Sequence, residues 1–75
     1  MDEQKILENF GFNFKVARMK FKMTQDDVVE KLGFSKSYIS NVENGLHNIS
    51  LINAIKFSSL VNKTIDEMIN SWFFL

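Results

Sequence analysis

The chain has 75 residues, a formal net charge of zero, 45% hydrophobic residues, three glycines, and neither cysteine nor proline. This length suits one small domain with a marginal core, and the lack of cysteine excludes disulfides and cysteine-ligated metal sites as stabilising links. Few glycines, no proline and many apolar residues favour an all-helical domain spanning residues 1–75. A net charge of zero argues by itself against non-specific binding to polyanions.

Charge is unevenly distributed along the chain. The net charge is −2 over residues 1–13, +3 over residues 14–41 and −1 over residues 42–75. A modestly basic middle segment permits phosphate contact on one face, although ordinary surface charge gives the same pattern. The N-terminus is acidic where a secretion signal would be basic, and no apolar run approaches the ~18 residues of a membrane span. We therefore expect a cytoplasmic protein with no membrane partner.

The first helix is predicted over residues 4–23. Apolar side chains recur at spacings of three and four residues on one face, at Ile6, Leu7, Phe10, Phe14, Ala17 and Phe21. Gly11 interrupts this pattern, and glycine is a poor helix former. The residues before Gly11 could therefore form a separate turn or a frayed start of the helix.

Residues 24–45, TQDDVVEKLGFSKSYISNVENG, have the pattern of two short helices joined by a tight turn. Thr24 and Asp27 have the spacing of a capping box, in which each side chain bonds a backbone N–H at the helix start. Gly33 can end the first of these helices in the left-handed conformation, and Ser35 can cap the second. Helices of about two turns are unstable alone in water, so other helices must hold them.

The second of these short helices has a polar face opposite its apolar residues Ile39 and Val42. This polar face consists of Lys36, Ser37, Ser40 and Asn41. With TQ, LG, SYIS and ENG at these separations, residues 14–69 resemble the Cro/repressor-type helix-turn-helix family of phage, plasmid and restriction-control regulators. The resemblance implies a compact all-α domain of five helices, with the helix-turn-helix formed by the second and third, that binds double-stranded DNA.

The resemblance also implies roles for individual residues. Base edges in the major groove would be read by Lys36, Ser37, Ser40 and Asn41. The DNA backbone would be contacted by Thr24, Gln25, Tyr38, Asn44 and Asn48. Arg18 and Glu43 would form a partly buried ion pair between the first and third helices. The alternatives are a plain polar helix face and two unrelated surface charges.

The segment 46–50 is predicted to be a loop, and Ser50 the N-cap of a fourth helix. His47 is the only histidine and has no partner at metal-ligand spacing, so we expect neither a metal nor a cofactor. Asn62 can end the fourth helix, because asparagine tolerates the left-handed conformation. Relative to the family pattern, Ile49 replaces a proline and Val29 replaces an alanine.

A fifth helix is predicted over residues 64–75, with Thr64 as its cap. It carries more apolar side chains than one helix end in a small domain can bury, and Ile65, Met68, Ile69, Trp72 and Phe73 are assigned to a dimer interface. Pairing of two chains about a two-fold axis would also stabilise a marginal core. Packing of Trp72 and Phe73 over the first helix is the alternative.

These observations predict a sequence-specific transcription regulator that binds a pseudo-palindromic operator as a homodimer. A restriction–modification controller protein is the favoured type, and the alternatives are a phage or plasmid repressor and a protein-interaction module such as an antitoxin or anti-repressor. An enzyme is not expected, because the sequence offers no cysteine nucleophile, no His–Asp–Ser set at a plausible separation and no phosphate-binding glycine loop. No small-molecule ligand is expected either.

Overall fold

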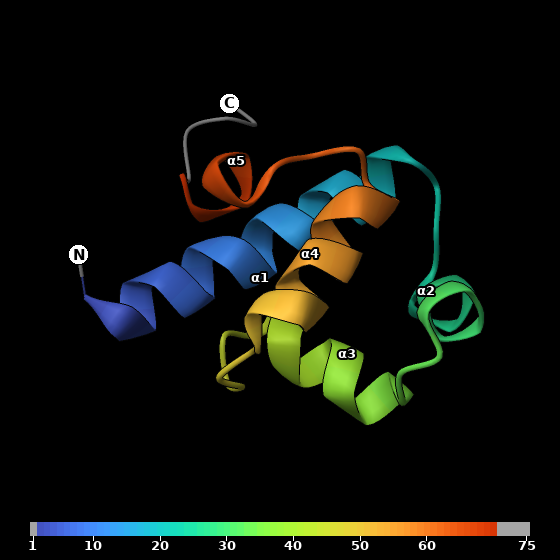
Figure 1. Cartoon of the computed structure of the whole chain (residues 1–75). Coiled ribbons are helices and arrows are strands. Elements are labelled where there is room, and N and C mark those ends of the chain that lie inside the picture. The colour runs from blue at the N-terminus through green and yellow to red at the C-terminus, as the bar shows by residue number, and fades with distance from the viewer. Residues whose placement is uncertain (1, 71–75) are drawn as a thin grey trace.

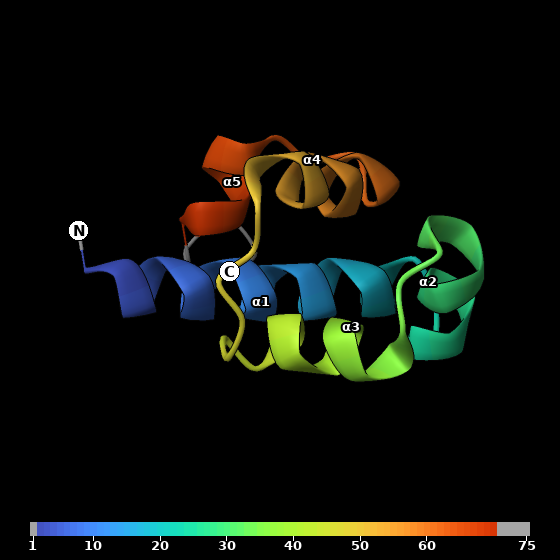
Figure 2. The same cartoon turned by 60° about the horizontal axis from the view of Figure 1, so that its bottom comes forward.

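The computed structural model describes residues 2–70, and in this range the chain forms five helices and no strand. They are α1 (Glu3–Lys20), α2 (Gln25–Leu32), α3 (Lys36–Glu43), α4 (Leu51–Leu60) and α5 (Ile65–Ile69). Helix α1 is the central element: α4 and α5 lie on one side of it, α3 lies on the other, and α2 packs near its C-terminal end (Figures 1 and 2). The predicted all-α, five-helix architecture is confirmed.

Each of these helices begins at a side chain that accepts a hydrogen bond from a backbone N–H of the first turn. These N-caps are Asp2, Thr24, Ser35, Ser50 and Thr64. Thr24 with Asp27 and Thr64 with Glu67 form complete capping boxes. The backbone N–H of each threonine lowers the pKa of the carboxyl that it bonds, at Asp27 and at Glu67. Both carboxylates therefore stay ionised at neutral pH, next to the positive ends of their helices.

The helix α1 ends three residues earlier than predicted, at Lys20 rather than at Met23. The N–H of Met23 bonds the carbonyl oxygen of Arg18 at 3.0 Å, and the N–H of Lys22 bonds that of Met19 at 2.9 Å. These two bonds form a Schellman motif and require a left-handed residue, here Lys22 with φ +58°. The same motif ends α4 at Asn62, as predicted.

Gly11 lies inside a continuous α1 and faces α3. A Cβ at this position would lie 2.1 Å from the carbonyl oxygen of Val42 and 2.7 Å from that of Glu43. Glycine is therefore needed here because the backbones of α1 and α3 cross closely. The structure settles the question left open by the sequence: Gly11 interrupts the apolar pattern without interrupting the helix.

The core contains side chains from all five helices, including Phe57 of α4. The Phe57 ring contacts those of Phe14 and Phe34, with centroids 4.8 Å and 5.3 Å away. Among residues 2–70, the other large apolar side chains that are fully buried are Val28, Ile39, Val61 and Met68. The short helices α2 and α3 are thus held by the burial of Val28 and Ile39 in this shared core.

The structure corrects the expected fifth helix. Helix α5 ends at Ile69, where Asn70 is extended, with φ −103° and ψ 113°. Met68 is 0% exposed and belongs to the core, so its assignment to a dimer interface is wrong. Ile65 and Ile69 are partly buried against the core. The assigned interface residues Trp72 and Phe73 lie outside the described residues.

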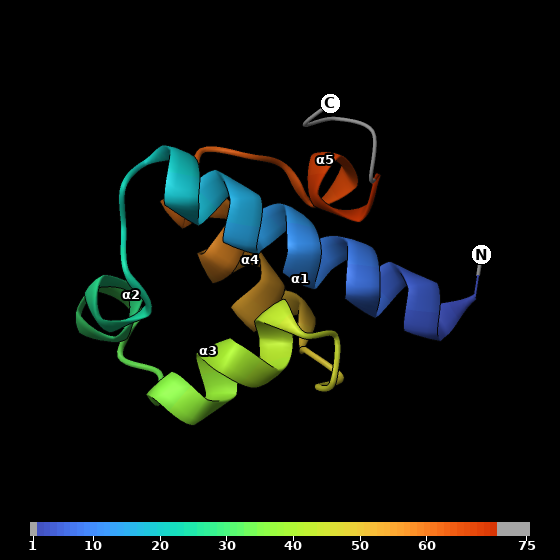
Figure 3. The ribbon, with the colours of Figure 1, turned by 180° about the vertical axis from the view of Figure 1, so that it is seen from behind.

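Asparagine side chains of α1 hold the C-terminal end of α5, which lies alongside α1 (Figure 3). Asn13 Nδ2 donates to the carbonyl oxygens of Met68 and Asn70 at 2.8 Å and 2.9 Å, and Asn9 Nδ2 donates to that of Ile69 at 3.0 Å. A helix end leaves its last carbonyl groups without intrahelical partners, so these bonds fix where α5 stops. Among residues 2–70, no helix is long and apolar enough to cross a membrane.

Candidate nucleic-acid interface

The helix α3 presents the predicted polar face to solvent. Ile39 and Val42 are 0% and 3% exposed, so they fix which side of α3 faces the core. On the opposite side Lys36 and Ser37 are exposed, whereas Ser40 and Asn41 are partly exposed. Amide, hydroxyl and ammonium groups are thus available together on one helix face, and these are the groups that recognise base edges.

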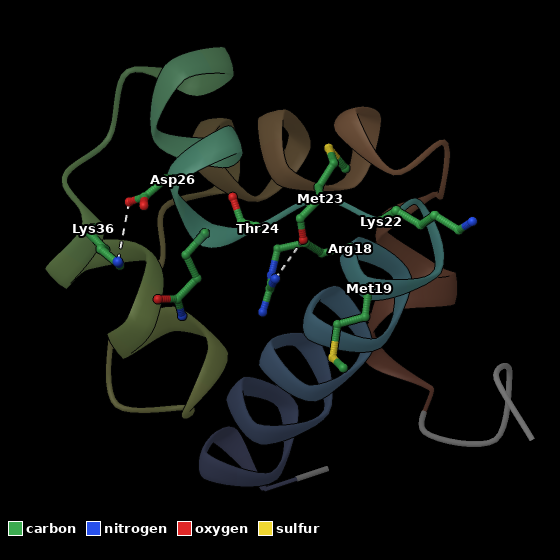
Figure 4. A pocket seen from close by; sticks show the side chains of 8 residues that line it. Arg18, Met19, Lys22, Met23, Thr24, Asp26 and Lys36 are labelled. Atoms are coloured by element: carbon green, nitrogen blue, oxygen red, sulfur yellow. Dashed lines mark hydrogen bonds and ion pairs between the residues drawn. The ribbon is translucent and has the colours of Figure 1, made fainter.

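A hollow of about 400 Å³ lies between the C-terminal end of α1 and the first turns of α2 and α3 (Figure 4). It is lined by Arg18, Met19, Lys22, Met23, Thr24, Gln25, Asp26 and Lys36. The lining contains more basic than acidic side chains, and the N-terminal end of α2 adds a partial positive charge. An anionic group such as a phosphate is therefore chemically suited to this place.

Lys36 forms an ion pair with Asp26 across the mouth of this hollow. The Lys36 Nζ lies 3.3 Å from the Asp26 Oδ1, and the two side chains are 60% and 76% exposed. Exposed pairs of this kind are typically worth only ~0–1 kcal/mol, because water and salt screen them. The pair joins the first turns of α2 and α3 but leaves Lys36 able to exchange Asp26 for another partner.

The predicted ion pair between Arg18 and Glu43 is present. Arg18 Nε lies 2.7 Å from Glu43 Oε2, and Arg18 Nη2 lies 3.3 Å from Glu43 Oε1. The guanidinium therefore binds the carboxylate in a bidentate way. The side chains are 10% and 2% exposed. Arg18 Nη1 also donates to the carbonyl oxygen of Met23 at 2.7 Å. This arrangement ties α1 to the end of α3 and to the segment that leads into α2.

Gln25 has a partner that the sequence did not reveal. Its Nε2 donates to Glu43 Oε1 at 3.1 Å, so its amide is directed at the ion pair as well as lining the hollow. The two residues are 18 positions apart in the sequence, so no pattern of neighbouring residues predicts this contact. Gln25 could have been assigned to this network only with the crossing of α2 and α3 already known.

Tyr38 leans toward α4 instead of standing free on the surface. Its ring contacts those of Phe34 and His47, with centroids 5.0 Å and 4.7 Å away, and its hydroxyl oxygen accepts a hydrogen bond from Asn53 Nδ2 at 3.1 Å. A tyrosine hydroxyl has one proton to donate in addition, so contact with a phosphate is still chemically possible.

The other assigned backbone-contact residues lie at the two ends of the helix-turn-helix. Thr24 is the exposed cap of α2, Asn44 is the exposed C-cap of α3, and Asn48 is exposed in the loop before α4. His47 in the same loop packs against Tyr38. Within the described residues, no group of three histidine or acidic side chains could hold a metal ion.

A comparison with known families matches residues 14–68 to the model described as "Helix-turn-helix". This range runs from the middle of α1 into α5 and includes the paired helices α2 and α3. The chain belongs to the helix-turn-helix family. It is also 30% identical over 54 residues to Control protein C.MunI from a Mycoplasma species, an alignment that covers 72% of this chain and 73% of that protein. The resemblance found in the sequence is confirmed, and the chain is a DNA-binding domain of the transcription-regulator type.

Proposed function

We propose that this helix-turn-helix protein is a sequence-specific regulator that reads duplex DNA as a homodimer bound to a pseudo-palindromic operator. The observation that carries the proposal is the division of α3 into a buried apolar side and an outward side with Lys36, Ser37, Ser40 and Asn41. A helix docked in the major groove by the polar side can present these groups to base edges.

Each of these side chains has a chemically defined role in the proposed complex. Asn41 can bond adenine N6 and N7 with two hydrogen bonds, Lys36 can donate to guanine O6 and N7, and Ser37 and Ser40 can donate or accept. The hollow between α2 and α3 would take a phosphate group. Further contacts to the DNA backbone would come from Thr24, Gln25, Tyr38, Asn44 and Asn48.

Replacing Asn41 by alanine is expected to relax the preference for one base pair, at a cost of about 1–3 kcal/mol in discrimination. The operator is first selected from a random duplex pool, and the affinity is then measured on the operator, on its single-base variants and on a scrambled duplex. Asn48→Ala is the matched control, because loss of a backbone contact should weaken binding to all duplexes alike. Equal losses on operator and scrambled DNA for Asn41→Ala would contradict the assignment.

Self-association is the second part of the proposal, and α4 supplies the surface for it. Leu51, Ile52 and Ile55 are 69%, 67% and 48% exposed. Of these three, Leu51 lines an apolar groove of about 610 Å³, whose lining also includes Ile6, Leu7, Phe10, Ile49, Ile65 and Ile69. Apolar surface of this kind usually marks an interface. One domain reads few base pairs, so two copies with half-sites ~34 Å apart suit the proposed operator.

Leu51→Asp, at a 69% exposed residue that lines the groove, is expected to keep the fold and to weaken self-association strongly, because a charge would have to be buried between two copies. Sedimentation equilibrium across a concentration series measures this directly. Phe12→Asp is the control, since Phe12 is 56% exposed on α1 but does not line the groove. Wild-type protein that stays monomeric at every concentration would remove the homodimer from the proposal.

The controller role is proposed from the similarity to Control protein C.MunI. A phage or plasmid repressor would use the same interface, and genome context separates these two regulators. A protein-interaction module, such as an antitoxin or anti-repressor, differs physically. DNA binding should weaken steeply as salt is added, because bound phosphates release counterions. The affinity for a protein partner bound through apolar contacts should instead stay unchanged or increase as salt is added.

A further inference from the structure

Gln25 lies between the hollow proposed to receive DNA and the buried ion pair. Its side chain lines the hollow and is partly buried. Its Nε2 donates to Glu43 Oε1 at 3.1 Å, the same oxygen that accepts from Arg18 Nη2 at 3.3 Å. Glu43 is 2% exposed in its side chain, so these bonds are shielded from water. Shielded hydrogen bonds to an ionised group are among the stronger ones in a protein.

The carboxylate of Glu43 is thus shared by donors from two different helices. Arg18 belongs to α1, Gln25 to the first turn of α2, and Glu43 to the last turn of α3. The exposed pair of Lys36 with Asp26 joins α2 and α3 as well, but at the solvent-facing ends of both side chains. The bond of Gln25 therefore connects the start of α2 to the helix that carries the base-reading face, on the protected side of the crossing.

We propose that Gln25 is a positioning residue for base reading, which acts through Glu43 by fixing the first turn of α2 against the end of α3. The inference rests on the proposed reading of DNA by α3 and extends it, because it gives Gln25 a role beyond a phosphate contact. A residue that only touches phosphate weakens binding to all sequences alike. A residue that sets the placement of α3 changes the discrimination between sequences.

The first test is Gln25→Ala, measured on the selected operator and on scrambled duplex with Asn48→Ala as control. The expected result is a loss of discrimination of about tenfold, the size that one lost hydrogen bond to a charged group gives. Asn48→Ala should lower both affinities by the same factor. An equal loss on both duplexes for Gln25→Ala would overturn the inference.

The second test needs no DNA. In Gln25→Glu a new carboxyl faces the carboxylate of Glu43, and the two like charges raise the pKa of the new group in the folded state. The variant should therefore match the wild type in stability below the unfolded-state pKa of a glutamate, about 4.3. It should become progressively less stable than the wild type as the pH rises through the raised folded-state pKa. Urea unfolding at a series of pH values measures the difference.

The two tests separate the failure of the inference from the failure of the proposed function. If the wild type ignores every duplex at low salt, DNA reading fails, while the unfolding series still reports whether Gln25 and Glu43 interact. If DNA is bound and the difference in free energy of unfolding between Gln25→Glu and the wild type does not change with pH, the contact with Glu43 is refuted. Gln25 would then be assigned only a phosphate contact.

Discussion

Gly11→Ala is expected to lower the free energy of unfolding by about 3 kcal/mol or more, which is at or above the upper end of the usual cost of overpacking a core. The added Cβ would meet the carbonyl oxygens of Val42 and Glu43 at 2.1 Å and 2.7 Å. Both obstructing atoms belong to the backbone of α3, so no side-chain rotation relieves the clash. The helices α1 and α3 must move apart, and the ion pair of Arg18 with Glu43 lies on the same crossing. Urea unfolding of the wild type and the variant measures the change.

The predicted loss of stability is opposite in sign to the usual effect of replacing glycine by alanine in a helix. In an exposed helix interior, replacing glycine by alanine stabilises by about 1 kcal/mol, because alanine is the better helix former. Gly33→Ala is the matched control, because no atom lies within 4 Å of its added Cβ and there is no clash. Its φ of +77° should cost about 1–2 kcal/mol of backbone strain and nothing more. A stabilising Gly11→Ala would show that α1 and α3 do not approach as closely as the structure has them.

The features predicted correctly from sequence alone depend on neighbours along the chain. Thr24, Ser35, Ser50 and Thr64 were identified as caps because a capping side chain bonds a backbone group three residues ahead. The end of α1 was missed for a related reason. Its left-handed residue is Lys22, and lysine gives none of the signal that glycine or asparagine gives at such a position.

Features that depend on the packing of distant segments could not be read in this way. The amide of Asn13 and the carbonyl of Met68 meet across 55 residues, and Gln25 reaches Glu43 across 18. Counting apolar residues along α5 could not reveal that Met68 faces the core, since a five-residue helix has no long periodic pattern. The ion pair of Arg18 with Glu43 was anticipated through the family resemblance, and its link to Gln25 was not.

Arg18→Met is expected to lower the free energy of unfolding by about 3–5 kcal/mol, because it leaves a buried carboxylate without its charged partner. Glu43 would keep a single neutral donor from Gln25, at a site where its side chain is 2% exposed. A small domain has a total stability near the low end of ~5–15 kcal/mol, so the variant should be largely unfolded at moderate temperature. Thermal unfolding followed by circular dichroism measures this. Asp26→Asn, which breaks the exposed pair with Lys36, should change stability by no more than ~1 kcal/mol.

The double variant Arg18→Met with Glu43→Leu separates two roles of the ion pair, its contribution to the stability of the fold and its contribution to the placement of α3. With both charges removed, no charge is left buried, and apolar replacements of similar volume are often neutral or stabilising. We therefore expect the double variant to be more stable than Arg18→Met alone. It should nevertheless discriminate operator from scrambled DNA less well than the wild type, because Gln25 and the carbonyl of Met23 lose their partners and only the exposed pair of Lys36 with Asp26 still joins α2 to α3. Full discrimination in a stable double variant would mean that apolar packing alone orients α3.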